Sequence, residues 1–247
     1  MTTPNRALWH ARRLFYVADG PWYRTQLFER LGSERYAYPA LFAMDRMLTR
    51  HVLGNGPGTF FEAGAHDGYT QSNTYALEAR HGWSGVLVEA VPKLAAKCAK
   101  RRQRSRVFNC ALVEESEPGA TVKVYFGDLL SNIADARGSE EASKEFATGG
   151  LVNTLQEGYE VEVPARTLDS VLQEAGVERP DVMCLDVEGL ELGILRGSDL
   201  ERHGPRWLLI EMLDMDAQLP AFQALLGDQY EIAEIPTPHD VLFRALR

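Results

Sequence analysis

Short apolar runs alternate with amphipathic segments along the chain from residue 59 onward. The first run, Thr59-Phe60-Phe61, is rich in side chains that favour β structure and predicts a buried strand. Runs of the same kind lie at 85–89, 106–113, 181–187 and 206–212. Helical patterns separate them at 72–81, 92–103, 167–175 and 190–196. Because each parallel crossover needs a covering helix, the alternation predicts an α/β protein with a doubly wound, mostly parallel sheet and helices on both faces.

Two more apolar runs, 230–235 and 240–246, follow a short helical pattern at 221–226 and close the chain. The short connection between these runs predicts a hairpin. Such a hairpin completes a seven-stranded sheet and inserts one antiparallel strand into it.

The region between the third and fourth strands departs from this regular pattern. Residues 122–126 and 161–163 alternate apolar with polar side chains, which predicts antiparallel ribbons at a margin of the sheet. The stretch between them, 128–158, is polar and punctuated by glycine. A segment of this length between strands is usually either a binding loop or disordered, and we prefer a substrate loop.

Aromatic and aliphatic residues recur at helical spacing through the first fifty positions, as at Leu8, Trp9, Phe15 and Tyr16. This spacing predicts two domains, a helical cap over residues 1–56 and an α/β domain over 57–247. In the simpler interpretation the cap packs on an edge of the sheet. In the alternative it covers the substrate site or pairs two subunits as a homodimer.

The amino-acid composition limits which molecules the protein is expected to bind. The 247 residues are 45% hydrophobic and 25% charged, and the formal net charge is −9. That balance disfavours nucleic acid as a substrate, because its backbone attracts basic proteins. The three cysteines, Cys98, Cys110 and Cys184, lack metal-ligand spacing and sit in apolar contexts. No apolar run is long enough for a membrane span, and we expect a cytoplasmic protein.

The turn after the first strand carries the first candidate site. An acid, Glu62, precedes two glycines, Gly64 and Gly68, and glycine permits both a tight turn and a close approach of ligand to backbone. A dinucleotide-binding turn would need glycine at the position of His66 so that a pyrophosphate can fit. A carboxylate with no such glycine suits a ligand that carries positive charge.

Acids also end the second, fourth and fifth predicted strands, at Glu89, Asp186 and Glu211. Ligands in open parallel sheets bind beyond these carboxyl ends. Glu89 is placed to accept both hydroxyls of a ribose, although an acid at a strand end can also be merely solvated. At the end of the third strand, Asn109 and Cys110 are candidates to line an adenine, and Cys110 fits a core position equally well.

The stretch Asp186-Val187-Glu188-Gly189-Leu190-Glu191 is the second candidate site. Alternation places Asp186 and Glu188 on the same side of an extended chain. Paired acids there could bind an amino group, hold a divalent metal or accept a hydroxyl proton. The simpler interpretation is that Glu188 and Glu191 stabilise the start of the next helix through its dipole. We assign that role to Glu191 and a functional one to Asp186.

Five segments together resemble the FkbM family of S-adenosylmethionine-dependent methyltransferases. They are residues 61–68, 88–92, 167–172, 185–197 and 209–211, in matching order and spacing over about residues 59–246. Two positions depart from the family: His66-Asp67-Gly68 replaces the usual asparagine-glycine of the first loop, and Cys184 replaces the usual lysine. The resemblance implies the Rossmann-like class I methyltransferase fold and transfer of a methyl group to a hydroxyl of a sugar, glycoside or natural product.

With the positions above, the resemblance implies a binding set for S-adenosylmethionine. That set is Glu62, Gly64, Ala65, Asp67, Gly68, Glu89, Ala90, Asn109, Cys110 and Asp186.

For catalysis, a hydroxyl nucleophile needs a base, or a metal that lowers its pKa. Asp186 is the first candidate for either role, with Glu211 and His239 as partners and Asp240 placed to orient His239. Asp186 and Glu211 are the candidate ligands of Mg²⁺ or another divalent cation.

Two other functions compete with this one. The first is an NAD(P)-dependent oxidoreductase, which His66 and the antiparallel strand at the end of the chain argue against. The second is a binding module that has kept the fold without catalysis. We expect a small-molecule acceptor, no nucleic acid and no membrane span.

Overall fold

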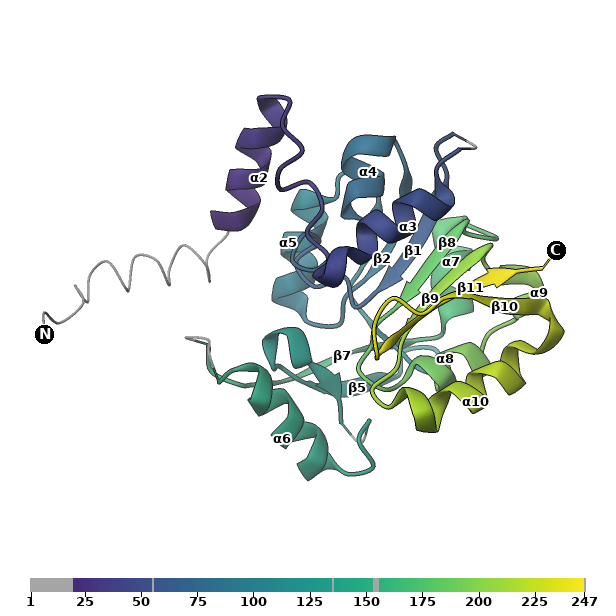
Figure 1. Cartoon of the computed structure of the whole chain (residues 1–247). Helices are drawn as coiled ribbons and strands as arrows, with labels where there is room; N and C mark the ends of the chain where they lie inside the picture. Colours follow the sequence, from purple (N-terminus) through teal and green to yellow (C-terminus); the bar gives the residue numbers. More distant parts are fainter. Residues whose placement is uncertain (1–19, 55, 135, 153–155, 247) are drawn as a thin grey trace, which may run out of the picture.

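The computed structural model of the chain describes residues 20–54, 56–134, 136–152 and 156–246. Within these ranges the chain forms a seven-stranded sheet, flanked by helices, and a smaller four-stranded sheet (Figure 1). The helical pattern predicted at Leu8–Tyr16 lies outside the described residues.

The large sheet has the strand order β10-β11-β9-β8-β1-β2-β3. Its strands are β1 (Thr59–Ala63), β2 (Ser84–Val88), β3 (Arg106–Phe108), β8 (Val182–Leu185), β9 (Trp207–Glu211), β10 (Tyr230–Glu234) and β11 (Asp240–Ala245). The pairs β1–β2, β1–β8, β2–β3 and β8–β9 are parallel. Strand β11 runs antiparallel to both of its neighbours, β10 and β9. The predicted seven strands and the terminal hairpin are therefore confirmed.

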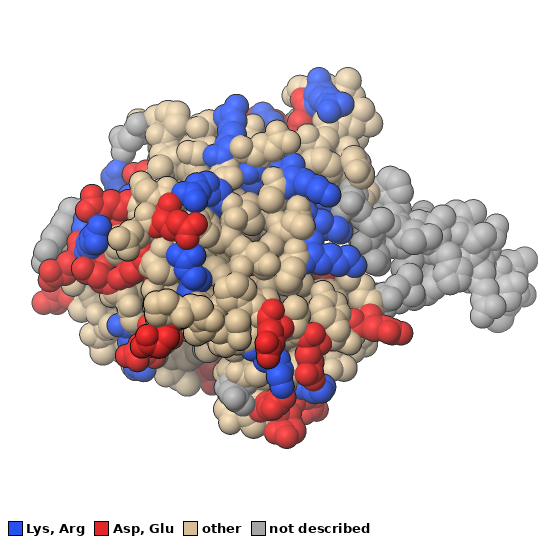
Figure 2. Space-filling view, turned by 180° about the vertical axis from the view of Figure 1, so that it is seen from behind, with Lys and Arg blue, Asp and Glu red and all other residues tan. Residues whose placement is uncertain are grey.

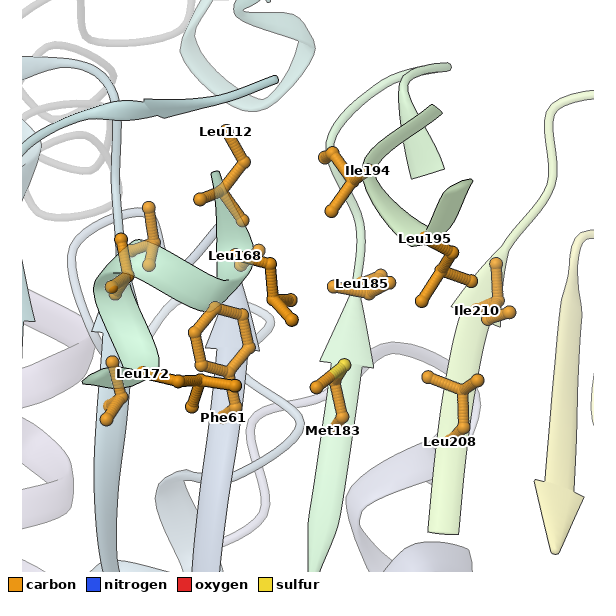
Figure 3. Close-up of a cluster of buried hydrophobic side chains, with 14 of the residues drawn as sticks. Phe61, Leu112, Leu168, Leu172, Met183, Leu185, Ile194, Leu195, Leu208 and Ile210 are labelled. Atoms are coloured by element: carbon orange, nitrogen blue, oxygen red, sulfur yellow. The ribbon is translucent and has the colours of Figure 1, made fainter. Parts of the chain in front are cut away.

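Alternation along the central strand builds a core on each side of the large sheet. Phe61 belongs to one cluster, with side chains from α7 (Leu168–Ala175), α8 (Glu191–Arg196) and α10 (Met215–Leu226), as Figure 3 shows for the first two helices. Phe60 belongs to the other cluster, together with side chains from three helices on the opposite face. Those helices are α3 (Met44–Val52), α4 (Tyr75–His81) and α5 (Pro92–Arg101). Two adjacent phenylalanines point to opposite faces because successive strand residues do so.

The predicted third strand, 106–113, is interrupted at Asn109. The Asn109 side-chain amide donates to the backbone carbonyls of Glu89 and Ala90, at 2.9 and 2.8 Å. The chain leaves the large sheet there and enters the small one. This small sheet has the order β4-β7-β5-β6, with β4 (Ala111–Leu112), β5 (Thr121–Tyr125), β6 (Asn132–Ile133) and β7 (Glu160–Arg166).

Residues 121–125 pair antiparallel with 160–164, as predicted, but the position of this pair in the fold differs from the prediction. The two strands form a separate sheet rather than a margin of the large one. Their apolar sides, including Val124 and Val163, pack with Val91 and Leu94 at the start of α5. The segment between β5 and β7 holds η2 (Asp128–Leu130) and α6 (Glu140–Gly150).

Two helix starts differ from the predictions. Helix α4 begins at Tyr75 rather than Ser72, because the Ser72 hydroxyl accepts the Tyr75 backbone N–H at 3.1 Å while residues 69–74 form turns. Helix α10 begins at Met215, and Asp214 caps it. Pro220 lies inside this helix and made its first half look like a loop in the sequence.

The described part of the N-terminal region holds α2 (Gly20–Arg30), η1 (Leu41–Ala43) and α3. Thr25 of α2 is fully buried, and its hydroxyl shares a 2.6 Å hydrogen bond with the Tyr69 hydroxyl. Because α3 shares a core cluster with the sheet, part of the predicted cap belongs structurally to the α/β domain. The boundary at residue 56 stays a prediction. No helix in the described part of the chain has the length and apolarity to cross a membrane.

Candidate active site

A cavity of about 340 Å³ opens at the carboxyl ends of β1, β2, β8 and β9. Residues 128–133, between β5 and α6, form the opposite wall. Of the predicted site residues, those that line the cavity are Glu62, Gly64, Glu89, Ala90, Cys110, Asp186 and Glu211. The first six residues of the 128–158 stretch line the cavity, and the binding of substrate by this stretch stays a prediction.

Gly64, which follows β1, lies against Asp186, which follows the neighbouring strand β8. Its φ is +80°, and a Cβ on it would overlap the backbone carbonyl oxygen of Asp186. The Gly64 and Ala65 backbone N–H groups both donate to the Val88 carbonyl, at 3.1 and 3.0 Å. Glycine is required here by the neighbouring strand, and the close approach also brings Asp186 to the turn.

His66 lines the cavity and joins its two walls. The residue has a φ of +47°, and its Nε2 lies 3.2 Å from Asp128 Oδ1 on the 128–133 wall. Burial by itself lowers the pKa of His66, but hydrogen bonds to Asp128 and Asp67 and the nearby charges outweigh it and raise the pKa to about 9. His66 is therefore a cation near neutral pH. Sequence reasoning gave this residue no binding role, because a loop histidine is usually just solvated.

Glu89 is held in a fixed orientation at the end of β2. Its carboxylate accepts the backbone N–H groups of His66 and Val91, at 2.8 and 2.7 Å. Burial raises the pKa of Glu89, while these hydrogen bonds and the His66 charge oppose the rise. Each oxygen keeps a free lone-pair direction for a ligand, since a carboxylate offers about four acceptor sites.

Glu62 has an internal role in addition to lining the cavity. Its carboxylate accepts hydrogen bonds from the Ser72 and Thr74 hydroxyls and the Asn73 backbone N–H. The Arg102 guanidinium lies 3.6 Å away. Glu62 thus organises the turns before α4, and its contact with the donor stays a prediction.

Four predicted donor-binding residues lie outside the described lining of the cavity: Ala65, Asp67, Gly68 and Asn109. The Asp67 carboxylate forms a 2.5 Å ion pair with Arg101 and accepts the backbone N–H groups of Tyr69 and Thr70. Burial opposes ionisation of Asp67, but His66 and Arg101 hold its pKa well below the usual range. The Asp67 carboxylate therefore stabilises the loop that follows β1 through contacts outside the cavity lining.

Three carboxylates gather on the cavity wall. Asp186 follows β8, Glu211 ends β9 and Glu188 lies in the turn before α8, and one oxygen of each lies within 4.8 Å of the others. Glu188 has a φ of +59° and forms a 3.2 Å ion pair with Arg137. Glu191 does not join them. Its carboxylate accepts the backbone N–H groups of Val187 and Gly189 in the turn before α8, and its predicted stabilisation of that helix through the dipole stays a prediction.

The cluster disfavours full ionisation. Asp186 is open to the cavity, but protein surrounds it on the other sides. Burial, the Glu211 charge and a hydrogen bond with Glu211 hold the pKa of Asp186 well above its ordinary value. Burial and the same Glu211 charge raise the pKa of Glu188 to about 8, against the opposing effect of Arg137. Near neutral pH the site therefore retains protons that ordinary carboxylates have lost.

His239 is not among the described residues that line the cavity. Its Nδ1 lies 3.3 Å from the Met212 carbonyl, one residue beyond the end of β9. The expectation that Asp240 orients His239 is wrong: the Asp240 carboxylate accepts the Thr237 hydroxyl instead. Catalysis by His239 stays a prediction.

The fold and this site define a class. A mostly parallel seven-stranded sheet with an antiparallel β11, and a cavity at the carboxyl ends of its central strands, is the Rossmann-like fold of class I methyltransferases. Residues 62–230 match the family model described as the methyltransferase FkbM domain. This match covers more than half of the chain, so the protein belongs to that family and is an S-adenosylmethionine-dependent methyltransferase.

Among characterised proteins, the chain is 28% identical to the 31-O-demethyl-FK506 methyltransferase FkbM of Streptomyces tacrolimicus, over 79% of this chain and 80% of that one. Two solved structures are also similar. One is a TehB-like S-adenosylmethionine-dependent methyltransferase from Corynebacterium glutamicum, with a TM-score of 0.44 and 7% identity over 92% of this chain and 97% of the other. The other is Aeropyrum pernix fibrillarin, with a TM-score of 0.44 and 12% identity over 85% and 76%.

Proposed function

We propose that the protein transfers the methyl group of S-adenosylmethionine to a hydroxyl oxygen of a small molecule, such as a sugar, a glycoside or another natural product. The observation that carries the proposal is the hydrogen-bonded carboxyl pair Asp186 and Glu211 on the wall of the cavity. A hydroxyl acceptor must lose a proton, and a carboxyl group in its ionised form at this position can accept it. The relative from Streptomyces tacrolimicus carries an O-methyl transfer in its name.

The donor fits the half of the cavity formed by β1 and β2. Glu89 is oriented by two backbone N–H groups and would accept the two ribose hydroxyls. Ala90 and Cys110 line the cavity beside it and would contact the adenine. The Asp186 backbone lies against Gly64, so the amino acid end of the donor would lie between this turn and the acid cluster.

The acceptor would enter between the acid cluster and the 128–133 wall. Three carboxylates disfavour an anionic acceptor and favour hydroxyl groups, which donate hydrogen bonds to them. Leu129, Leu130 and Ile133 add apolar surface to the wall. A neutral molecule with several hydroxyl groups and an apolar part would bind both surfaces: its hydroxyls would bond to the carboxylates and its apolar part would pack on the 128–133 wall.

In the reaction, the acceptor oxygen attacks the methyl carbon and S-adenosylhomocysteine leaves. Alignment of the oxygen behind that carbon provides much of the rate enhancement. The ionised form of Asp186 takes the hydroxyl proton, and the raised pKa makes that form a stronger base than an ordinary aspartate. Glu211, which is hydrogen-bonded to Asp186, then accepts a hydrogen bond from the protonated group.

The same carboxylates fit a divalent cation. Asp186, Glu188 and Glu211 form an all-oxygen set of the kind that Mg²⁺ and Ca²⁺ prefer. A bound cation would lower the pKa of an acceptor hydroxyl and would take the place of the hydrogen bond between Asp186 and Glu211. Chelator treatment distinguishes the two cases, since only a metal-dependent enzyme would lose turnover while donor affinity is retained.

The direct test is S-adenosylhomocysteine release from purified protein against a panel of sugars, glycosides and macrolides. Release that depends on one acceptor, with the methyl group on its oxygen, supports the proposal. Asp186→Asn should abolish that release and keep donor binding. Tight NAD binding without donor binding would instead favour the oxidoreductase, and an inactive protein in which Asp186→Asn changes nothing would favour the binding module. A cytoplasmic location and a homodimer remain predictions.

A further inference from the structure

Helix α2 turns its apolar side outward. Tyr23, Leu27 and Leu31, the last just past the end of the helix, follow one another at four-residue steps and are 63%, 58% and 73% exposed. On the opposite side of the helix, Thr25 is fully buried and bonds to Tyr69. A helix packed on a protein normally buries its apolar stripe. The reversed orientation leaves three large apolar side chains in solvent.

A basic groove runs beside this stripe, between α2 and the C-terminal end of α5. Its volume is about 460 Å³, and its lining includes Trp22 and Arg30 from one side and Lys100 and Arg104 from the other. Stripe and groove adjoin, because Arg30 follows Tyr23 by seven residues and Leu27 by three and so lies on nearly the same side of α2.

The acids of the groove already have partners. Glu78 pairs with Arg102 at 2.9 Å, and the half-buried Glu29 bonds to Tyr75 and Gln26. The exposed side chains of Arg30, Lys100 and Arg104 have no carboxylate partner among the described residues. The groove therefore presents unneutralised positive charge.

Charge is segregated on a larger scale as well. Residues 93–106 contain seven Lys and Arg and no acid, although the whole chain has a formal net charge of −9. Three of the seven, Arg101, Arg102 and Arg106, pair with acids from other segments. Figure 2 shows Lys and Arg gathered over the upper part of one face, with Asp and Glu more common over its lower part. An anionic surface would repel most of this protein and attract it only through the basic region.

We propose that α2 and the adjoining groove bind the surface of a lipid bilayer that contains anionic phospholipids. Tyr23, Leu27 and Leu31 enter the headgroup region, and the three cations contact lipid phosphates. An apolar stripe bordered by basic residues is the pattern of helices that lie in a membrane interface. A two-fold dimer through this face is disfavoured, because it would bring the basic groove of one copy close to that of the other.

The test is flotation of the full-length protein with vesicles of phosphatidylcholine alone and of phosphatidylcholine with about 30% phosphatidylglycerol. We expect binding to the anionic vesicles only, weakened by high salt. Absence of binding to the anionic vesicles, or equal binding to both, would overturn the proposal.

Variants separate the two parts of the surface. Leu27→Ser should weaken vesicle binding about tenfold by removing an inserted side chain. Lys100→Gln and Arg104→Gln should each weaken it about fivefold, the effect of one charge near an anionic surface. The matched controls, Ile235→Ser and Arg206→Gln, remove an exposed apolar and an exposed basic residue elsewhere and should leave vesicle binding and methyl transfer unchanged.

Light scattering tests the competing explanation, in which the apolar stripe of α2 binds a second copy of the chain. A dimer that Leu27→Ser converts to a monomer would assign the stripe to a second copy of the chain and overturn the bilayer proposal. Vesicle binding that depends on the cations but not on Leu27 would overturn the insertion of the apolar stripe, since charge alone would then hold the protein on the vesicle. An unchanged mass for all variants, with the graded loss of vesicle binding, supports the proposal.

Discussion

Gly64 and Asp186 come from strands that are adjacent in space and 122 residues apart in sequence, and their backbones touch. A Cβ at position 64 would overlap the Asp186 carbonyl oxygen, and the φ of +80° disfavours any other residue as well. This contact holds the glycine turn against the acid cluster, so two walls of the cavity depend on one glycine.

Gly64→Ala should therefore destabilise the protein and abolish donor binding together. The positive φ alone costs about 1–3 kcal/mol, and the clash adds to it. Gly176→Ala is the matched control, because Gly176 has a φ of +73° and a Cβ added there would meet no atom within 4 Å. Thermal unfolding and calorimetric titration with S-adenosylhomocysteine measure both effects. Equal destabilisation by the two substitutions would show that the Asp186 contact is unimportant.

Glu89→Ala should weaken donor binding by about 1.5–3 kcal/mol, through loss of charge-assisted hydrogen bonds to the ribose. The substitution also frees the backbone N–H groups of His66 and Val91, so the melting temperature should be measured alongside affinity. Glu115→Ala, at an exposed acid, is the control. Unchanged affinity in calorimetry would remove Glu89 from the donor site.

Glu188→Gln should stabilise the protein more at pH 8 than at pH 5. The folded-state pKa of about 8 exceeds the ordinary 4.5, so folding favours the protonated form. Glu188 therefore lowers stability progressively as the pH rises from about 4.5 through 8, and glutamine removes that cost. We expect a gain of about 1–2 kcal/mol at pH 8 from denaturant titration. A gain that does not change with pH would contradict the raised pKa.

His66→Asn should destabilise the protein near pH 7 by about 1–3 kcal/mol, with the loss disappearing toward pH 10. The pKa of His66 is raised to about 9 by Asp128 and Asp67, against burial. Its stabilisation is therefore complete below the ordinary value of 6.5 and disappears as the pH rises through 9. Asparagine tolerates the positive φ at this position. His51→Asn, at a half-exposed ion pair with Glu234, is the control.

Most of the fold is visible in the sequence because it rests on local patterns. Apolar runs such as 206–212 predict strands, and the helical pattern at 167–175 matches α7, which Thr167 and Gly176 cap. Errors occurred where tertiary contacts override a local signal. The 106–113 run is continuous in hydrophobicity, yet the bonds from Asn109 to Glu89 and Ala90 divide it between two sheets.

The sequence by itself determined the order of strands and helices, the acids at the strand ends and the glycine turn, because periodicity, strand termini and turn chemistry depend on neighbouring residues. Only the tertiary structure decided which of these groups meet. It brought Asp186, Glu188 and Glu211 together, joined His66 to Asp128 and turned Asp67 away from the cavity. Distances between residues far apart in the chain follow from strand packing and from the burial of charge, and no local pattern encodes them.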